Sequence, residues 1–283
     1  MNKTIAYQGV QGAYSEQACK NAYETYETIA CDTFHEAMWM VEHGDADLAM
    51  IPLENSTAGR VEEIYRLIPK MSLHVIAEHF EPIVHCLLAL PDTKLEDLKY
   101  VASHPQALAQ CHNNILSLDL KAEAKLDTAG AAKELIDLND PQRAAIASKL
   151  AAELYGLQIL KENFEDKHGN TTRFFILSGE KSVPVCEPSK QYITSLVFQV
   201  KNIPAALYKV LGGFASNGIN LLKIESYMGT QMLPGSQFHI DIDGHMDSDI
   251  MRIALREVSF FAEDVRILGV YESHRDHKIE YTI

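Results

Sequence analysis

Four short polar clusters before residue 150 follow predicted strands, and each could bind an anion. The strands are 3–8, 47–53, 98–102 and 144–147, and the clusters after them are 9–15, 54–59, 103–106 and Ser148. At the carboxyl ends of strands in α/β sheets, the N–H groups and positive dipole ends of the following helices point into the crevice where ligands bind. We therefore expect an anionic small molecule at this edge of the sheet.

Each cluster also has a purely structural interpretation. The glycines of 9–15 could form a tight turn, Ser103 could begin a helix, and Asn55 with Ser56 could cap one. A dinucleotide is disfavoured, because the third glycine of G-x-G-x-x-G and its acidic partner are not at the required spacing. Only the coincidence of all four clusters favours a ligand site.

A fifth polar motif, Asn170-Thr171-Thr172-Arg173-Phe174, enters a predicted strand instead of leaving one. Its arginine beside two hydroxyls could hold a carboxylate, or could simply begin an exposed strand. Periodicity does not decide between the two.

The elements that would position these residues alternate up to about residue 180. Predicted strands are 3–8, 47–53, 73–77, 83–90, 98–102, 144–147 and 172–178, and predicted helices are 15–24, 33–43, 59–69, 105–117, 128–138 and 148–156. Thr33, Thr128 and Ser148 stand where N-caps are expected. This alternation predicts an α/β domain.

A second domain is expected after a polar stretch with two prolines at about 180–190, which is typical of a linker. The rest of the chain predicts strand 191–200, helix 205–217, strands 219–227 and 236–243, helix 247–260 and strand 264–271. That βαββαβ order is typical of a ferredoxin-like module. A chain of 283 residues also favours about two domains.

Composition excludes several classes of function. A net charge of -14 without a Lys/Arg cluster disfavours nucleic acid and anionic membranes as partners. The five cysteines lack C-x-x-C spacing and are expected to be reduced core residues, and His274 with His277 is interpreted as a solvated tail instead of a metal site. Without a secretory signal or a long apolar run, we expect a cytoplasmic protein that no segment anchors in a membrane.

The first domain resembles the prephenate dehydratase family in six ordered motifs. They are Gly9-Val10-Gln11-Gly12-Ala13-Tyr14-Ser15, Ile51-Pro52-Leu53-Glu54-Asn55-Ser56, Ser103-His104-Pro105-Gln106 with Gln110-Cys111, Asp127-Thr128-Ala129-Gly130-Ala131-Ala132, Tyr155-Gly156-Leu157, and 170–174. The resemblance implies a catalytic domain over 1–180, built as two lobes around a cleft like type II periplasmic binding proteins, with the chain crossing between the lobes twice.

The implied reaction removes the ring carboxylate of prephenate as CO₂ and its ring hydroxyl as water. Aromatisation drives it, so no cofactor and no metal is required. The resemblance assigns the proton donor to Thr172, a carboxylate contact to Arg173, and polar roles to Ser103, Asn55 and Gln110. It also places seven further residues around the substrate, namely Gly12, Ala13, Tyr14, Ser15, Ser56, Thr128 and Phe174.

Residues 190–283 resemble the ACT domain that follows this catalytic domain and binds phenylalanine between subunits. The family's G-A-L corresponds to Ala205-Ala206-Leu207, and its E-S-R-P to Glu225-Ser226-Tyr227-Met228, with Asn202 and Asn220 as further polar groups. The missing glycine and the replaced Arg-Pro leave open the strength and sign of control by phenylalanine. An ACT domain used only for dimerisation is the alternative, and a homodimer or homotetramer is expected.

Two other functions remain open at this point. Arogenate dehydratase acts on a substrate that differs by one amino group, and a two-lobed domain can also be a non-catalytic amino-acid-sensing protein. The intact Thr172-Arg173-Phe174 motif favours an enzyme.

Overall fold

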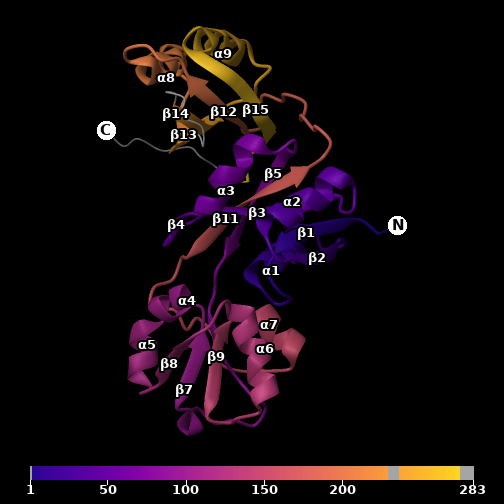
Figure 1. Cartoon of the computed structure of the whole chain (residues 1–283), viewed down its shortest axis with the longest axis vertical. Coiled ribbons are helices and arrows are strands. Elements are labelled where there is room, and N and C mark those ends of the chain that lie inside the picture. The colour runs from indigo at the N-terminus through magenta and orange to yellow at the C-terminus, as the bar shows by residue number, and fades with distance from the viewer. Residues whose placement is uncertain (1, 229–235, 275–283) are drawn as a thin grey trace. The chain divides into compact units, whose positions relative to one another are not determined.

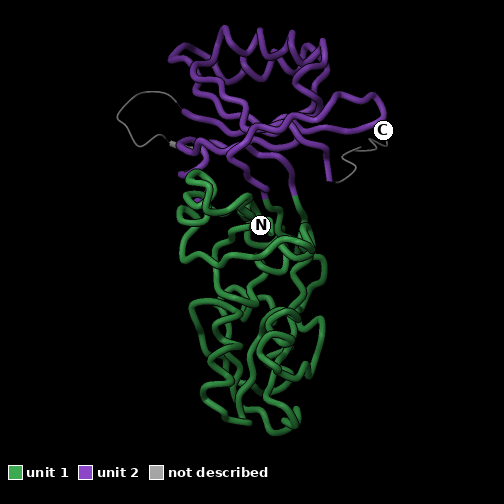
Figure 2. The backbone as a smooth tube through the Cα atoms, turned by 90° about the vertical axis from the view of Figure 1, so that its right-hand side faces the viewer, with its two compact units in different colours: residues 1–61, 79–174 green, residues 62–78, 175–283 purple. Residues whose placement is uncertain are grey.

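The computed structural model describes residues 2–228 and 236–274, and the chain divides into two compact units (Figure 2). Unit 1 comprises Met1–Val61 and His79–Phe174, and unit 2 comprises Glu62–Glu78 and Phe175–Ile283. Neither unit is a single continuous stretch of chain, because the chain passes between them three times: just before α3 at 61/62, inside β5 at 78/79 and inside β11 at 174/175. Residues 62–78 and 175–178, which belonged to the first predicted domain, thus group with the C-terminal segment.

The described elements alternate much as the sequence predicts. Their order is β1 (Thr4–Gln8), α1 (Tyr14–Ala22), β2 (Glu27–Cys31), α2 (Phe34–His43), β3 (Leu48–Asn55), β4 (Gly59–Arg60), α3 (Glu62–Leu67), η1 (Ile68–Lys70), β5 (His74–Pro82), β6 (Cys86–Ala89), η2 (Leu95–Asp97), β7 (Tyr100–Ser103), α4 (Pro105–Gln110), α5 (His112–Ser117), β8 (Lys121–Ala124), α6 (Thr128–Leu138), β9 (Arg143–Ala147), α7 (Lys149–Tyr155), β10 (Gln158–Lys161), β11 (Thr171–Ser178), β12 (Tyr192–Val200), α8 (Ala206–Ser216), β13 (Leu221–Met228), β14 (Ser236–Asp243), α9 (Asp249–Phe261) and β15 (Ala262–Glu272).

Two sheets form the framework before residue 179, which confirms the predicted α/β class. The first has the order β2-β1-β3-β11-β5 with β4 paired to β3, and the second has the order β10-β6-β9-β7-β8. The chain passes from the first sheet to the second after β5 and returns before β11. The two connections meet, since the N–H of Ile83 donates to the carbonyl of Asn170 over 2.9 Å.

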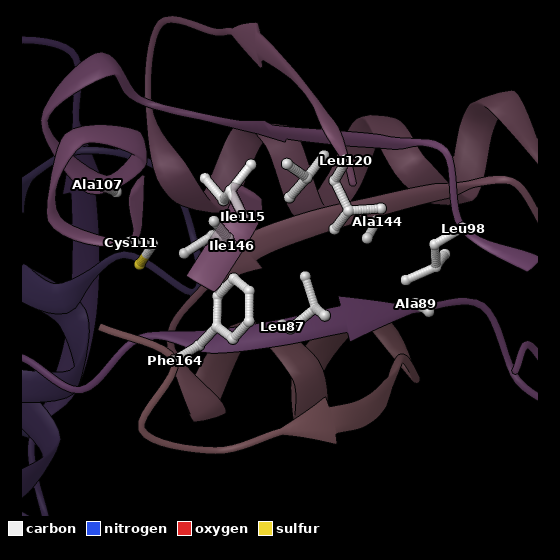
Figure 3. Close-up of a cluster of buried hydrophobic side chains, with 11 residues drawn as sticks. Leu87, Ala89, Leu98, Ala107, Cys111, Ile115, Leu120, Ala144, Ile146 and Phe164 are labelled. Carbon is white, nitrogen blue, oxygen red and sulfur yellow. The ribbon is translucent and has the colours of Figure 1, made fainter. Parts of the chain in front are cut away.

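The second sheet is buried on both faces. Leu87 and Ala89 of β6 pack into one apolar cluster with Ile146, Ile115 and Phe164 (Figure 3). The alternate residues of β6, Cys86 and Leu88, pack into a second cluster with alanines and leucines of α6 and α7. Successive side chains of a strand point to opposite faces, so a continuous apolar run is what a strand covered on both sides requires.

The βαββαβ order predicted for the C-terminal part is confirmed. Its antiparallel sheet runs β13-β14-β12-β15, and α8 and α9 cover one face (Figure 1). Within unit 2, the first half of β5 approaches β15 closely. A Cβ added at Gly269 would lie 1.8 Å from the carbonyl oxygen of Val75. Only glycine permits backbones to approach so closely.

Several predicted boundaries are wrong. The predicted helix 59–69 begins only at Glu62, because residues 59–60 pair with β3 as β4, and the predicted helix 105–117 is divided at Cys111. Thr128 is not an N-cap but the first helical residue, since the carboxylate of Asp127 accepts the N–H of Gly130 over 2.5 Å. The caps predicted at Thr33 and Ser148 are confirmed.

Four strands were not predicted from the sequence, and the prediction that every cysteine is buried is wrong for one of them. β2, β4, β8 and β10 are short and largely exposed or half-buried, so they lack the apolar run that marks a buried strand. Four cysteines are buried as expected, whereas Cys186 is exposed in the segment between β11 and β12. No helix among the described residues has the length and apolarity needed to cross a membrane.

Candidate active site

A cavity of about 450 Å³ lies in unit 1, lined by strand residues of the first sheet, by residues of α1, α4 and α6, and by connecting segments. Its size suits a small organic ligand. Seven residues singled out from the sequence line it, namely Tyr14, Ser15, Asn55, Gln110, Thr128, Thr172 and Phe174. Gly12, Ala13, Ser56, Ser103 and Arg173 are not among its lining residues. Arg60 and His85 line the cavity although they belong to none of the sequence motifs, and His104 and Asn170 line it although their motifs were given no role for them.

Successive side chains of β11 point to opposite faces of the sheet, so the three residues 172–174 do not all face the cavity. Thr172 and Phe174 line the cavity, whereas Arg173 between them is buried away from it. Its guanidinium lies 3.5 Å from the carboxylate of Glu54 and over the ring of Phe80 at 5.9 Å. The arginine that lines the cavity is instead Arg60 of β4, whose side chain is exposed.

Asn55, the last residue of β3, has an amide whose orientation is fixed by the backbone. Its Oδ1 accepts the N–H groups of Thr57 and Ala58 over 3.0 and 2.9 Å. Backbone N–H groups can only donate, so the other end of the amide must be the NH₂ group. Nδ2 donates over 2.9 Å to Oγ1 of Thr172. The Thr172 oxygen therefore accepts from Asn55, and its own proton remains available to a group in the cavity.

The same reasoning fixes the next amides in turn. Nδ2 of Asn55 also donates to Oδ1 of Asn170 over 2.7 Å, so the NH₂ of Asn170 faces Oε1 of Gln110 at 3.3 Å. Nε2 of Gln110 then donates to the hydroxyl of Thr57 over 2.7 Å. Side chains 115 residues apart in the chain thus belong to one hydrogen-bond network.

His85 extends this network to Tyr14. Nε2 of its ring lies 2.7 Å from Oε1 of Gln110, and Nδ1 lies 2.7 Å from the Tyr14 hydroxyl. The ring is buried, and burial lowers the pKa of His85 although the Gln110 contact and Glu165 oppose this. Burial raises the pKa of Tyr14, so its hydroxyl stays protonated. The one available sequence signal was a single histidine in an otherwise apolar run at 83–90.

The turn before α1 is occupied by the protein's own groups. The N–H of Gly12 donates to the carboxylate of Glu16 over 2.6 Å, and its carbonyl accepts the hydroxyl of Ser148 over 2.7 Å. A Cβ at Gly12 would lie 3.0 Å from Cα of Ala151, so the glycine allows this close approach. Gly12 therefore joins the turn to α7, outside the cavity.

Two predicted polar groups have structural partners. Ser103 is buried and donates to the carbonyl of Ile146 over 2.6 Å, which links β7 to β9. Oγ of Ser56 accepts the N–H of Thr171 over 3.0 Å and so holds the start of β11 beside the end of β3. Neither residue is among those that line the cavity.

The lining carries no acidic side chain among the described residues, although the chain as a whole is strongly negative. Arg60 contributes a permanent positive charge, and the hydroxyls of Ser15, Thr128 and Thr172 contribute donors. Pro52, Val61 and Ile83 supply apolar surface. The cavity therefore suits an anion that has an apolar body.

Metal ligands are not gathered anywhere in the described parts of the chain, where no group of three or more His, Cys, Asp or Glu could hold an ion. The N–H of His274 donates to Glu78 over 3.0 Å, and His277 lies outside the described residues.

Comparison with known proteins gives a consistent result. The model of a family described as prephenate dehydratase matches residues 5–182. A bifunctional N-acyl-homoserine lactone acylase/prephenate dehydratase of Komagataeibacter europaeus is 43% identical over 269 residues, which cover 95% of this chain and 95% of that protein. The chloroplastic arogenate dehydratase/prephenate dehydratase 2 of Arabidopsis thaliana is 40% identical over 276 residues, which cover 94% of this chain and 72% of that protein.

A solved structure is also similar over nearly the whole chain. It is that of a prephenate dehydratase from Arthrobacter aurescens in complex with L-Phe, with 32% sequence identity and a TM-score of 0.87. The match covers 95% of this chain and 89% of that one, so it includes the C-terminal βαββαβ module as well as the two sheets.

Proposed function

The chain belongs to the prephenate dehydratase family of lyases, and we propose that its cavity converts prephenate to phenylpyruvate, CO₂ and water. The observation that carries the proposal is the orientation of Thr172, whose oxygen accepts from Asn55 and whose proton is left for a ligand. This is the arrangement needed to assist a leaving hydroxyl.

The reaction balances with one proton supplied by the site. The bond from the ring to its carboxylate breaks and releases CO₂, the electron pair enters the ring, and the C–O bond to the hydroxyl breaks as the ring becomes aromatic. The departing oxygen takes a proton and leaves as water. Thr172 relays this proton through a strong hydrogen bond: as its hydroxyl proton passes to the departing oxygen, the Thr172 oxygen takes a proton from solvent water and is left neutral. General acid assistance of this kind contributes roughly 10²–10⁴-fold.

The two carboxylates of prephenate would be treated differently. Arg60 and the hydroxyls of Ser15 and Thr128 would hold the carboxylate that stays. Apolar lining such as Phe174 and Ile83 would surround the carboxylate that leaves and deprive it of water, which favours its loss as neutral CO₂. Arg173 would act from behind the wall, where it pairs with Glu54.

Prephenate suits this lining better than arogenate. Arogenate carries an ammonium group in place of the side-chain carbonyl, and a buried ammonium needs an anionic or strongly accepting partner. The described lining offers no carboxylate and does offer an arginine. Arogenate dehydratase activity, named for plant relatives, is the alternative.

A direct assay tests the proposal. The purified protein is incubated with prephenate or with arogenate, and phenylpyruvate or phenylalanine is measured. We expect faster turnover of prephenate. If only arogenate is converted, the protein is an arogenate dehydratase. If neither compound is converted, the hypothesis of a non-catalytic, amino-acid-sensing protein is favoured.

Residues 190–283 would form an ACT regulatory domain beside a catalytic domain of 1–180. Asn202 and Ala205-Ala206-Leu207 lie at the start of α8, and Asn220 lies beyond its end. Eleven helical residues separate the two groups by about 16 Å within one chain. A phenylalanine bound by both would need two copies of the module, so the proposed effector site lies between subunits of a homodimer or homotetramer.

Glu225 and Ser226 lie in β13, where the carboxylate of Glu225 is 3.4 Å from Nζ of Lys223. Glu225 would meet the ammonium of the effector. Adding phenylalanine to the prephenate assay while the molecular mass is followed tests the control. If neither the turnover rate nor the molecular mass changes when phenylalanine is added, the remaining role for the C-terminal module is subunit assembly. The cytoplasmic location stays a prediction.

A further inference from the structure

His85 occupies an unusual place in the chain. It ends the connection from the first sheet to the second, and Asn170 ends the connection that returns. Both lie on the cavity wall, and both contact Oε1 of Gln110. The single amide of Gln110 therefore joins the two connections.

The backbone of His85 is hydrogen-bonded on both sides, by its N–H and by its carbonyl. Its N–H donates to the carboxylate of Glu165 over 2.9 Å, and its carbonyl accepts the N–H of Phe164 over 2.7 Å. The ring also packs edge-on against Tyr14 with centroids 5.5 Å apart. The ring thus has a partner at each nitrogen and an aromatic neighbour at its edge.

The position of the ring proton follows from the amides. The N–H groups of Thr57 and Ala58 orient Asn55, which orients Asn170, which in turn presents its NH₂ to Gln110. Oε1 of Gln110 can only accept, so Nε2 of His85 must carry a proton. Nδ1 then accepts from the hydroxyl of Tyr14 at 2.7 Å, and the carbonyl of Val84, 3.0 Å from that hydroxyl, is a second acceptor for the same proton.

We propose that His85 is a positioning residue for the dehydration: its Nε2–H holds the Gln110 amide and through it Asn170, the side chain that shares the Asn55 amide with Thr172. The inference rests on the proposed function. His85 does not donate the proton itself, since both ring nitrogens face protein groups. The lowered pKa of His85 is consistent with a neutral ring that carries a single proton.

Two substitutions separate the two ring nitrogens. The amide of glutamine reaches the place of Nε2, whereas the amide of asparagine reaches only that of Nδ1. His85→Gln therefore preserves the donor to Gln110, and His85→Asn preserves the acceptor for Tyr14. We expect His85→Asn to lower kcat by about 3- to 10-fold, the value of one hydrogen bond, with KM nearly unchanged. His85→Gln should retain most of the kcat.

A double substitution tests whether His85 acts through Gln110. In a Gln110→Ala background, His85→Asn should cost no further kcat, because the amide that it orients is gone. Equal losses with His85→Asn and His85→Gln, or an undiminished cost in the Gln110→Ala background, would overturn the proposal. Wild-type turnover of prephenate is measured in parallel, so failure of the proposed function is seen separately.

Histidine-ring nitrogen NMR supplies a second measurement if His85→Asn does not fold. In the wild-type protein the His85 resonances, identified by their loss in His85→Gln, should show a protonated Nε2 and an unprotonated Nδ1 at neutral pH. A proton on Nδ1 alone would contradict the inference.

Discussion

The amide of Asn55 donates to the hydroxyl oxygen of Thr172 over 2.9 Å, and two backbone N–H groups prevent that amide from turning round. The relationship defines which atom of Thr172 is left for chemistry. A hydroxyl has one proton, and here it is not used by Asn55.

Removal of the Thr172 hydroxyl should abolish most turnover while the shape of the cavity stays. We expect Thr172→Val to lower kcat by about 10²-fold or more with little change in KM, because general acid assistance acts on the transition state. Steady-state kinetics with prephenate gives both values. Thr172→Ser, which keeps a hydroxyl, is the matched control. Equal effects on kcat and KM would sink the assignment.

Reversal of the hydrogen bond between Asn55 and Thr172, so that Thr172 becomes the donor, should also lower kcat, although the Thr172 hydroxyl is kept. In Asn55→Asp one oxygen still accepts the N–H groups of Thr57 and Ala58, while the other replaces the NH₂ group. Thr172 must then donate to the aspartate, and its proton is withdrawn from the substrate. We expect kcat to fall by about 10²-fold. Thr172→Val added to Asn55→Asp should cost little more, and wild-type kcat in Asn55→Asp would contradict this account.

Glu16 should make stability depend on pH. Burial raises the pKa of this carboxyl, but the ammonium of Lys20 and the N–H of Gly12 outweigh burial, so the pKa in the folded protein is lowered. A lowered pKa means that the stabilisation is complete above the unfolded value of about 4.3 and is lost as the pH falls further through the folded value.

Glu16→Gln should therefore reduce the free energy of unfolding by about 1–2 kcal/mol at pH 7. Urea unfolding at pH 7 and in acid measures the difference between variant and wild type, which should shrink below pH ~4. The exposed Glu24, replaced by glutamine, is the control. A difference that is independent of pH would show that packing, not charge, holds the Gly12 turn.

The sequence predicted elements better than contacts, and β6 and β11 show why. Continuous apolar runs identified both strands, and strand alternation explains why Thr172 and Phe174 face the cavity together. The same alternation turns Arg173 away from the cavity, but the sequence motif alone does not show which of its residues face the cavity.

The hydrogen-bond network lay beyond sequence analysis for a different reason. Asn55 meets Asn170 only because β3 and β11 are neighbours in one sheet, and no local pattern records pairing across 115 residues. His85 was overlooked because a single histidine just before a buried strand has no spacing partner. Arg60 was hidden by the helix wrongly predicted at 59–69.

Ala205 stands where the family motif G-A-L has glycine, and its replacement by glycine should change the stability of the C-terminal module. It is the N-cap of α8 with φ 58° and ψ 31°, a left-handed conformation that costs a residue with a Cβ about 1–2 kcal/mol. Ala205→Gly should therefore raise the free energy of unfolding by about 1 kcal/mol. Ala206→Gly, at the first residue of α8, relieves no left-handed conformation and should lower it by up to about 1 kcal/mol. Thermal unfolding of both variants measures the contrast, and a loss of stability in both would show that the left-handed conformation carries no strain.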